Sequence, residues 1–81
     1  MKKLMRFTAS WCGPCKSLAT NLELVSTDIP IDVIDIDVHS EVAMEYGIRG
    51  VPTLVMLEDG KEIKRMSGTK TVTQLTEWIN D

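Results

Sequence analysis

Cys12 and Cys15 are the residues of this sequence best suited to covalent chemistry, and they are its only cysteines. Two residues separate them, so a bond between the two sulfurs would close one small ring. An apolar run from Leu4 to Phe7 precedes the pair and predicts a strand. Apolar residues at helical spacing follow it: Leu18, Leu22 and Val25. We therefore expect Cys12 where a strand passes into the N-terminus of a helix.

That position changes the chemistry of a thiol. The free backbone N–H groups and the dipole at a helix N-terminus stabilise negative charge. A thiol placed there loses its proton more easily, and the thiolate is the reactive form. Gly13 allows a tight turn and should leave the sulfur accessible. Pro14 has no N–H to leave unpaired and is tolerated in the first helical turn. The pair therefore has the parts of a dithiol–disulfide couple.

Length and composition indicate the class of protein and the compartment in which this couple would act. The 81 residues predict a single domain spanning 1–81. With only two cysteines, the chain does not resemble the small secreted domains that are held together by several disulfides. Arg6 interrupts the first apolar stretch, which is too short for a signal peptide, and no run approaches the roughly 20 apolar residues of a membrane span. The net charge of −3 offers no basic field for nucleic acid. We expect a cytoplasmic protein, because a redox pair in a reducing compartment is usually catalytic or sensing.

Periodicity and turn signals predict seven elements. Four strands are expected at Lys2–Thr8, Ile31–Val38, Thr53–Leu57 and Glu62–Met66. Helices are expected from Cys12 or Gly13 to about Thr27, from Ser40 to about Tyr46, and after Thr71. The last helix would place Val72, Leu75, Trp78 and Ile79 on one face.

Short signals mark the ends of several elements. Ser40 is expected to cap the middle helix and Gly47 to end it. Asp59-Gly60 is a strong signal for a hairpin turn. Thr71 and Gln74 fit a capping box at the start of the last helix.

The order β-α-β-α-β-β-α predicts an α/β fold with helices on both faces of a four-stranded mixed sheet. We expect right-handed crossovers that make the first three strands parallel, and an antiparallel edge strand from the hairpin. The second strand carries apolar residues on both faces, which is typical of a buried parallel strand.

Two segments of this chain resemble the thioredoxin family. Phe7-Thr8-Ala9-Ser10-Trp11-Cys12-Gly13-Pro14-Cys15-Lys16 is similar to the family's active-site segment. Tyr46-Gly47-Ile48-Arg49-Gly50-Val51-Pro52-Thr53-Leu54 is similar to the segment around its cis-proline. The hairpin and Gly68 also fall where the family has them. The resemblance covers nearly the whole chain and implies a thioredoxin fold, without the family's usual N-terminal strand and helix.

The resemblance implies a role for each matching residue. Cys12 would be the exposed nucleophile that attacks a substrate disulfide, and Cys15 would resolve the mixed disulfide. Pro52 would follow a cis peptide bond and lie beside the two sulfurs. The remaining residues would form the substrate-binding surface: Trp11, Gly13 and Pro14 around the cysteines, Val51 through its backbone, and Gly68 as a low groove wall.

The resemblance also implies an activity and its partners. The protein would reduce protein disulfides as a thiol–disulfide oxidoreductase and electron carrier. It would be recharged by a thioredoxin reductase or a similar dithiol donor. It would need no cofactor beyond the Cys12–Cys15 disulfide, no metal, no nucleic acid and no membrane. We expect a monomer.

Three positions depart from the family pattern. Thr20 stands where the family has a proline that kinks the active-site helix, so we expect a straighter helix. Arg6 stands where the family usually has a buried aspartate beneath the second cysteine, and Val33 stands where it has a lysine. We expect Arg6 either to pair with Asp35 or to extend its head group to solvent. In either case its positive charge would favour a nearby thiolate and make the couple more oxidising. We expect Lys16, like Arg6 and Asp35, to modulate the redox couple.

Two metal sites are alternative interpretations of these residues. A zinc half-site at the two cysteines needs further ligands, and His39 is the only other soft ligand. A metal site at Asp32, Asp35 and Asp37 is disfavoured, because Asp32 lies at odd spacing from the other two and faces the opposite side of a strand.

Two other functions are open. A glutaredoxin-like, glutathione-dependent reductase fits the small size, but not the Trp11 and Gly-Pro pattern of the motif. A redox-independent assembly subunit would retain its function without the cysteines.

Overall fold

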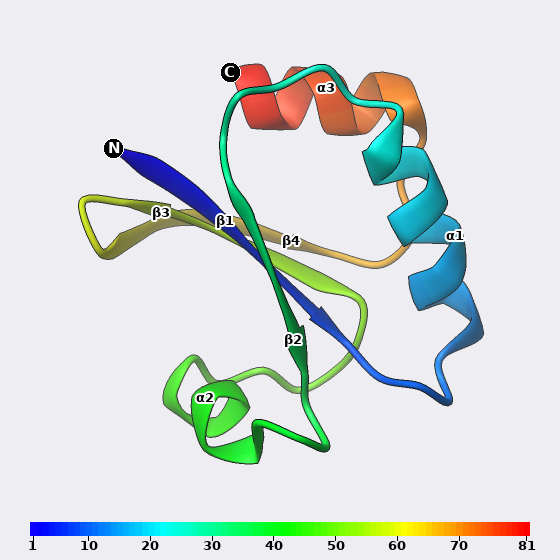
Figure 1. The fold of residues 1–81 in the computed structure, drawn as a ribbon, viewed down its shortest axis with the longest axis vertical. Coiled ribbons are helices and arrows are strands. Elements are labelled where there is room, and N and C mark those ends of the chain that lie inside the picture. The colour runs from blue at the N-terminus through cyan, green and yellow to red at the C-terminus, as the bar shows by residue number, and fades with distance from the viewer.

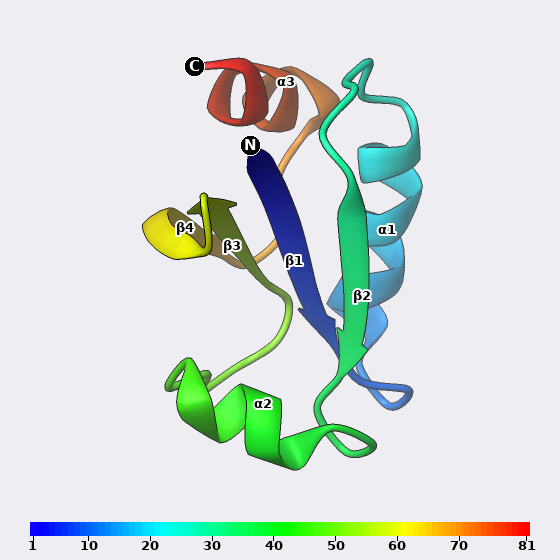
Figure 2. The same cartoon turned by 60° about the vertical axis from the view of Figure 1, so that its left-hand side comes forward.

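The structure is a computed structural model that describes residues 1–81. Four strands form one mixed sheet in the order β2-β1-β3-β4. Figures 1 and 2 show α1 and α3 on one side of the sheet, and α2 near the end at which β2 finishes. The predicted element order and the α/β class are confirmed. The strands are β1 (Lys2–Thr8), β2 (Ile31–Asp35), β3 (Thr53–Glu58) and β4 (Lys61–Ser67), and the helices are α1 (Gly13–Glu23), α2 (Ser40–Glu45) and α3 (Val72–Asn80).

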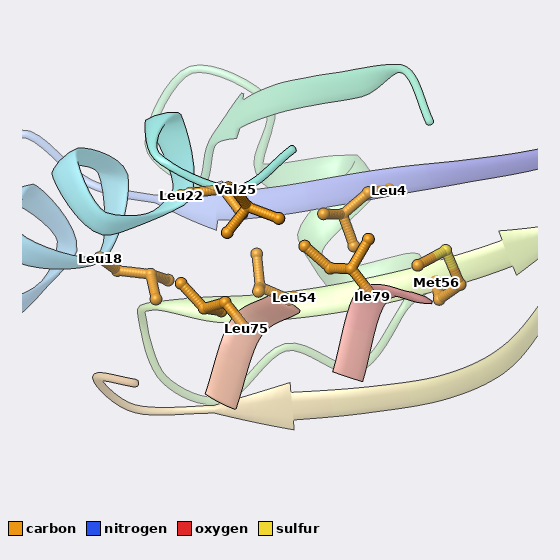
Figure 3. Packing of buried hydrophobic residues seen from close by; sticks show 8 residues of the cluster. All are labelled: Leu4, Leu18, Leu22, Val25, Leu54, Met56, Leu75 and Ile79. Atoms are coloured by element: carbon orange, nitrogen blue, oxygen red, sulfur yellow. The ribbon is translucent and has the colours of Figure 1, made fainter. Parts of the chain in front are cut away.

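The larger hydrophobic core lies between the sheet and the pair of helices α1 and α3 (Figure 3). Leu75 and Ile79 of α3 are fully buried, as the helical spacing predicted. Trp78, expected in the core, is half-buried and packs against this cluster from its rim. Burial of these side chains holds both helices on the sheet. The cluster consists of Leu4, Leu18, Leu22, Val25, Leu54, Met56, Leu75 and Ile79.

A second cluster covers the opposite face of the sheet. Ala43 of α2 packs there with buried residues of β1, β2 and β3, among them Phe7 and Val55. The rings of Phe7 and Tyr46 lie 6.0 Å apart at an interplanar angle of 53°. Because β1 and β3 are covered on both faces, they form the centre of the domain, with helices on both sides as predicted.

The direction of β3 differs from the prediction. β1 runs parallel to β2, with Leu4 opposite Ile31, but antiparallel to β3, with Leu4 opposite Met56. The expectation of three parallel strands is therefore wrong. The short length of α2 explains the difference, because six residues rise only about 9 Å in an α-helix. This helix does not carry the chain back along the sheet, so β3 starts at the end where β2 finished (Figure 2).

The position and length of β2 also differ from the prediction. The strand lies at an edge of the sheet instead of being buried, and it ends at Asp35 instead of Val38. Its end follows from local hydrogen bonds. The Asp35 carbonyl accepts the N–H groups of Val38 and His39 at 3.2 and 2.8 Å, and its carboxylate accepts the N–H of Asp37 at 2.8 Å. These bonds turn the backbone away from strand pairing.

Two helix boundaries need correction. α1 ends at Glu23, not near Thr27, because the N–H groups of Leu24 and Val25 bond to carbonyls three residues back, both at 3.1 Å. This tighter turn closes the helix and directs Val25 into the core. In α2 the capping residue is His39, without a side-chain cap bond, and the expected cap Ser40 is the first helical residue.

The predicted turn and capping box are both present. Asp59 and Gly60 have positive φ values of 52° and 85°, as a tight hairpin between β3 and β4 requires. The Thr71 hydroxyl accepts the N–H of Gln74 at 3.1 Å, and the Gln74 side chain accepts the N–H of Thr71 at 3.0 Å. No helix of this fold has the length and apolar character needed to cross a membrane.

We expect Thr71→Ala to lower the free energy of unfolding by about 1 kcal/mol, because it leaves the first turn of α3 without its cap. Urea unfolding of the oxidised protein measures this change. Thr73→Ala is the matched control, since Thr73 is exposed and helical and makes no capping bond. The control should be neutral or slightly stabilising. An equal loss in both variants would contradict a specific role for the cap.

Candidate functional site

The two cysteines form a disulfide where β1 passes into α1. Their Cα atoms lie 5.3 Å apart. Cys12 is the N-cap of α1, with extended backbone angles, and its sulfur accepts the N–H of Cys15 at 3.2 Å. Pro14 lies in the first turn of the helix. The predicted placement of Cys12 at the junction of a strand and a helix is confirmed.

Both cysteines are buried in this oxidised form. Cys12 is only 4% exposed and Cys15 only 2%. They cluster with Ala9, and the half-buried Ile36 and Val51 pack against them. The expectation of an exposed Cys12 is therefore wrong for the disulfide state. The bond to Cys15 holds the Cys12 sulfur against this apolar group. Gly13 and Pro14, the two residues between the cysteines, are exposed.

Trp11 lies on the surface beside the disulfide, as predicted. Its side chain is 67% exposed, and its indole N–H donates to a carboxylate oxygen of Asp37 at 2.9 Å. This bond fixes one edge of the ring while an apolar face remains open to a partner. Asp37 is held in turn by the Asp35 carboxylate, which accepts its backbone N–H.

Asp37 and Ile36 are site residues that sequence reasoning missed. From the sequence, Asp37 was considered only as a disfavoured metal ligand, and Ile36 only as part of a predicted strand. A usable signal was present, because the carboxyl ends of parallel neighbouring strands meet at one edge of a sheet. The N–H of Ile36 bonds to the Thr8 carbonyl at 2.9 Å, which brings the end of β2 to the cysteine loop.

The segment before β3 forms another side of the site. The Val51–Pro52 peptide bond is cis, as expected. Val51 packs against the cysteine cluster, and the Thr53 hydroxyl donates to the Gly50 carbonyl at 2.7 Å. The Pro52 carbonyl accepts the N–H of Gly68 at 3.0 Å. The structure therefore brings Val51, Pro52 and Gly68 together with the disulfide.

Arg6 does not pair with Asp35, and the proposed exchange of charges between β1 and β2 is wrong. Arg6 lies opposite Val33 in the sheet, whereas Asp35 lies opposite Thr8 and holds the turn at Asp37. The Arg6 side chain is half-buried at a cavity of about 200 Å³ between α1 and β2. The outcome agrees with the alternative expectation, in which its head group extends toward solvent.

Glu23 of α1 is the acidic residue that lines this cavity with Arg6. Burial lowers the pKa of Arg6 below its ordinary value, and the Glu23 carboxylate partly opposes that shift by raising the pKa. Lys16 is exposed on the first turns of α1, directly after Cys15. Two cationic side chains thus come from the elements that hold the cysteines.

The donor set for a metal is sparse. No group of three or more His, Cys, Asp or Glu side chains gathers in an arrangement that could hold a metal ion. His39 is exposed, and its Nδ1 lies 3.8 Å from the Glu41 carboxylate. The two thiols that a zinc half-site would need are bonded to each other.

Comparison with known proteins identifies relatives along the whole chain. The family model for thioredoxin matches residues 1–81. A thioredoxin of Chlamydia caviae is 40% identical over 80 residues, which cover 95% of this chain and 78% of the relative. A thioredoxin of Mycobacterium tuberculosis is 35% identical over 82 residues, which cover 96% of this chain and 71% of the relative.

Solved structures agree with these sequence relatives. A mutant thioredoxin from Halobacterium salinarum superposes with a TM-score of 0.90 at 37% identity, covering 98% of this chain and 72% of that one. The oxidised mitochondrial thioredoxin 3 of Saccharomyces cerevisiae superposes with a TM-score of 0.87 at 32% identity, covering 99% and 77%. The similarity is high enough to establish both the fold and the family.

Gly68 offers a test of the backbone that supports the site. Its φ is +84°, and a Cβ atom there would meet no heavy atom within 4 Å. We expect Gly68→Ala to lower the free energy of unfolding by about 1 kcal/mol, because the strain arises from the backbone alone. Urea unfolding of the oxidised protein measures the loss.

Gly50→Ala is the matched control for that measurement. A Cβ atom at Gly50 would also meet no heavy atom within 4 Å, but the φ of Gly50 lies outside the left-handed region. Alanine at such a position is neutral or stabilising. Equal stabilities of the two variants would contradict the strain assigned to Gly68.

Proposed function

This chain belongs to the thioredoxin family and is a thiol–disulfide oxidoreductase that reduces protein disulfides, and from that premise we propose the roles of its individual residues. Cys12 is the attacking nucleophile and Cys15 is the resolving thiol. One observation carries this assignment. Cys12 is the N-cap of α1, and its sulfur accepts the backbone N–H of Cys15 at 3.2 Å. The same N–H and the helix dipole would stabilise a thiolate on Cys12.

The exchange proceeds in two displacements. The Cys12 thiolate attacks one sulfur of the substrate disulfide, so a Cys12–substrate bond forms, the substrate S–S bond breaks and one substrate thiolate leaves. The Cys15 thiolate then attacks the Cys12 sulfur. The Cys12–Cys15 bond forms, and the second substrate thiolate is released. Two electrons pass from the protein dithiol to the substrate, and the oxidised protein has the disulfide seen here.

The surface around the disulfide supplies the substrate-binding residues. Trp11 offers an exposed apolar ring held by Asp37, and Gly13 and Pro14 expose the start of α1 next to it. Val51 packs against the cysteines, where its backbone would pair with an extended substrate segment. Pro52 and Gly68 are hydrogen-bonded to each other and complete the groove. The missing side chain of Gly68 keeps this wall low.

The partners follow from the exchange. A dithiol carrier needs a disulfide substrate and a donor that returns two electrons, and we assign a thioredoxin reductase or an equivalent dithiol protein as the donor. Such a cycle runs in a reducing compartment, which supports the cytoplasm as the location and cellular electron transport as the process. We propose that the protein acts as a monomer, because each step uses only the two cysteines of one chain.

We expect the two cysteine variants to fail in different ways. Cys12→Ser should lower the rate at which dithiothreitol reduces insulin disulfides to the rate measured without the protein, because the attacking sulfur is gone. Cys15→Ser should instead accumulate a mixed disulfide between Cys12 and substrate, visible as a covalent adduct by mass spectrometry. An adduct on Cys15 in the Cys12→Ser variant, with turnover retained, would reverse the assignment.

Arg6 and Glu23 bear on the reduction potential. The Arg6 guanidinium is half-buried under α1, where its positive charge is less screened than in water. A positive charge favours the thiolate and hence the reduced state, which raises the reduction potential. Glu23 opposes this field because it carries the opposite charge at the same cavity. Lys16 would act in the same direction as Arg6, more weakly because it is exposed.

We expect Arg6→Met to lower the reduction potential by roughly 10–30 mV and Glu23→Gln to shift it in the opposite direction. Equilibration with glutathione redox buffers at pH 7 measures both values. The paired variants serve as controls for each other, because a merely structural effect on the helix would not change sign between them. Shifts of the same sign, or no shift in either variant, would refute the electrostatic role.

A further inference from the structure

The two edges of the sheet are protected to different degrees. The β4 edge carries charged residues, and a register shift between Met56 and Leu57 interrupts its pairing with β3. Lys64 lies 4.9 Å above the Trp78 ring, and Arg65 donates to the Tyr46 carbonyl at 2.8 Å. Charges and irregular pairing of this kind discourage the addition of another strand.

The β2 edge has free backbone groups. Two bonds fix how β2 meets β1: the Leu4 N–H donates to the Pro30 carbonyl, and the Ile36 N–H donates to the Thr8 carbonyl, both at 2.9 Å. Even-numbered residues of this segment therefore turn their backbone toward β1. Because backbone direction alternates along a strand, Ile31, Val33 and Asp35 turn their N–H groups outward. An extended chain is the kind of partner that pairs with such a row.

The side chains of this edge are apolar and exposed. Ile31 is 36% exposed and Val33 is 56% exposed. Both line the 200 Å³ cavity between β2 and α1, together with Ala19, Leu22, Glu23 and Arg6. An apolar side chain on an added strand would lie over Ile31 and Val33 and enter this cavity, which removes apolar surface from water.

The charge around this edge selects the partner. The sequence contains no lysine or arginine between Lys16 and Arg49. Of the two basic residues that β1 brings to this edge, Lys3 is already paired with Asp32, and Arg6 faces Glu23. Two acidic residues of that interval are therefore matched by a cation and the others are not, so the interval is acidic overall and a cationic strand complements it. Seven acidic residues lie in that interval: Glu23, Asp28, Asp32, Asp35, Asp37, Glu41 and Glu45.

A second copy of this chain fits the edge less well. Antiparallel pairing about a two-fold axis at Val33 would place Asp32 of each copy diagonally across from Asp32 of the other. Like charges at such spacing are unfavourable. The acidic interval of each copy would also lie beside that of the other, and the two would repel.

We propose that the free edge of β2 binds an extended segment of another protein in which apolar and basic residues alternate. The apolar side chains cover Ile31 and Val33, and the basic ones lie on the other face, where they share Asp32 with Lys3. The binding uses backbone pairing and charge and requires no thiol chemistry, so it is tested separately from the redox function. Ile36 follows directly after this edge and contacts the cysteine cluster, so a bound segment would end near the disulfide.

The test uses a fluorescein-labelled peptide of alternating valine and lysine, with blocked ends, titrated with the oxidised protein and followed by fluorescence polarisation. We expect saturable binding that weakens at least tenfold as salt is raised, because oppositely charged groups attract across the edge. A peptide with glutamate in place of lysine should not bind. Amide chemical shifts should change at residues 31–35.

Two variants at one position separate the backbone pairing from the side-chain contact. Val33→Pro removes an outward N–H and should weaken binding at least tenfold without breaking the pairing with β1. Val33→Lys keeps the N–H but puts a charged side chain where the apolar side chains of the bound strand would pack, so it should weaken binding of the lysine peptide by a similar factor. Met44→Lys is the matched control, because Met44 is 81% exposed on α2 and its added charge should leave binding unchanged. Circular dichroism and thermal unfolding check that each variant is folded.

Three results would overturn the proposal. The first is equal binding of the lysine peptide to wild type, Val33→Pro and Val33→Lys. The second is a set of amide shifts around Trp11 and Pro52 instead of residues 31–35. The third is self-association of the protein that displaces the peptide, because the occupant of the edge would then be a second copy.

Discussion

The redox end of this molecule depends on the pairing of β1 with two neighbours that run in opposite directions. β2 runs parallel to β1, so both strands finish at the same end of the sheet, and the Ile36 N–H bonds to the Thr8 carbonyl there. β3 runs antiparallel to β1, so it begins at that end, with Thr53 opposite Phe7. The loop that holds the cysteines therefore meets the segment after β2 and the segment before β3, although both are distant along the chain.

The same geometry accounts for the chemical difference between the two sulfurs. Both lie in an apolar cluster, and burial of a thiol disfavours its charged form. Only Cys12 caps α1, where the N–H of Cys15 points at its sulfur. We therefore expect burial to act on both cysteines in the reduced protein, and the helix N-terminus to act on one. An electron carrier needs this inequality, because one thiol must attack while the other waits.

Features encoded over a few residues were predictable from the sequence. The Asp59-Gly60 turn, the Thr71–Gln74 capping box and the place of Cys12 at a helix start each depend on spacings of one to three residues. The direction of β3 and the edge position of β2 were not predictable in this way. Both are decided by which strands pair across the whole chain, and apolar content alone does not distinguish an edge strand from a buried one.

The site was predicted in part for the same reason. Cys12, Cys15 and Pro52 carry local signatures, whereas Asp37 reaches Trp11 across 26 residues of sequence. The partner of Arg6 was misassigned because two acidic residues were available to it. The turn after β2 engages Asp35, and that engagement leaves Glu23 as the neighbour of the guanidinium. Such competition between partners is settled only when the elements are placed in space.

The location of the chain ends has a consequence for tethering. The amino group of Met1 pairs with Asp59 at the tip of the β3–β4 hairpin, and the Asp59 N–H donates to the Met1 carbonyl at 2.9 Å. Figures 1 and 2 show both termini at the end of the sheet away from the loop before α1. A fusion partner, a surface linker or an electrode attachment at either terminus would leave the molecule on the side opposite its disulfide. A domain immobilised in this way would have its disulfide facing the solution.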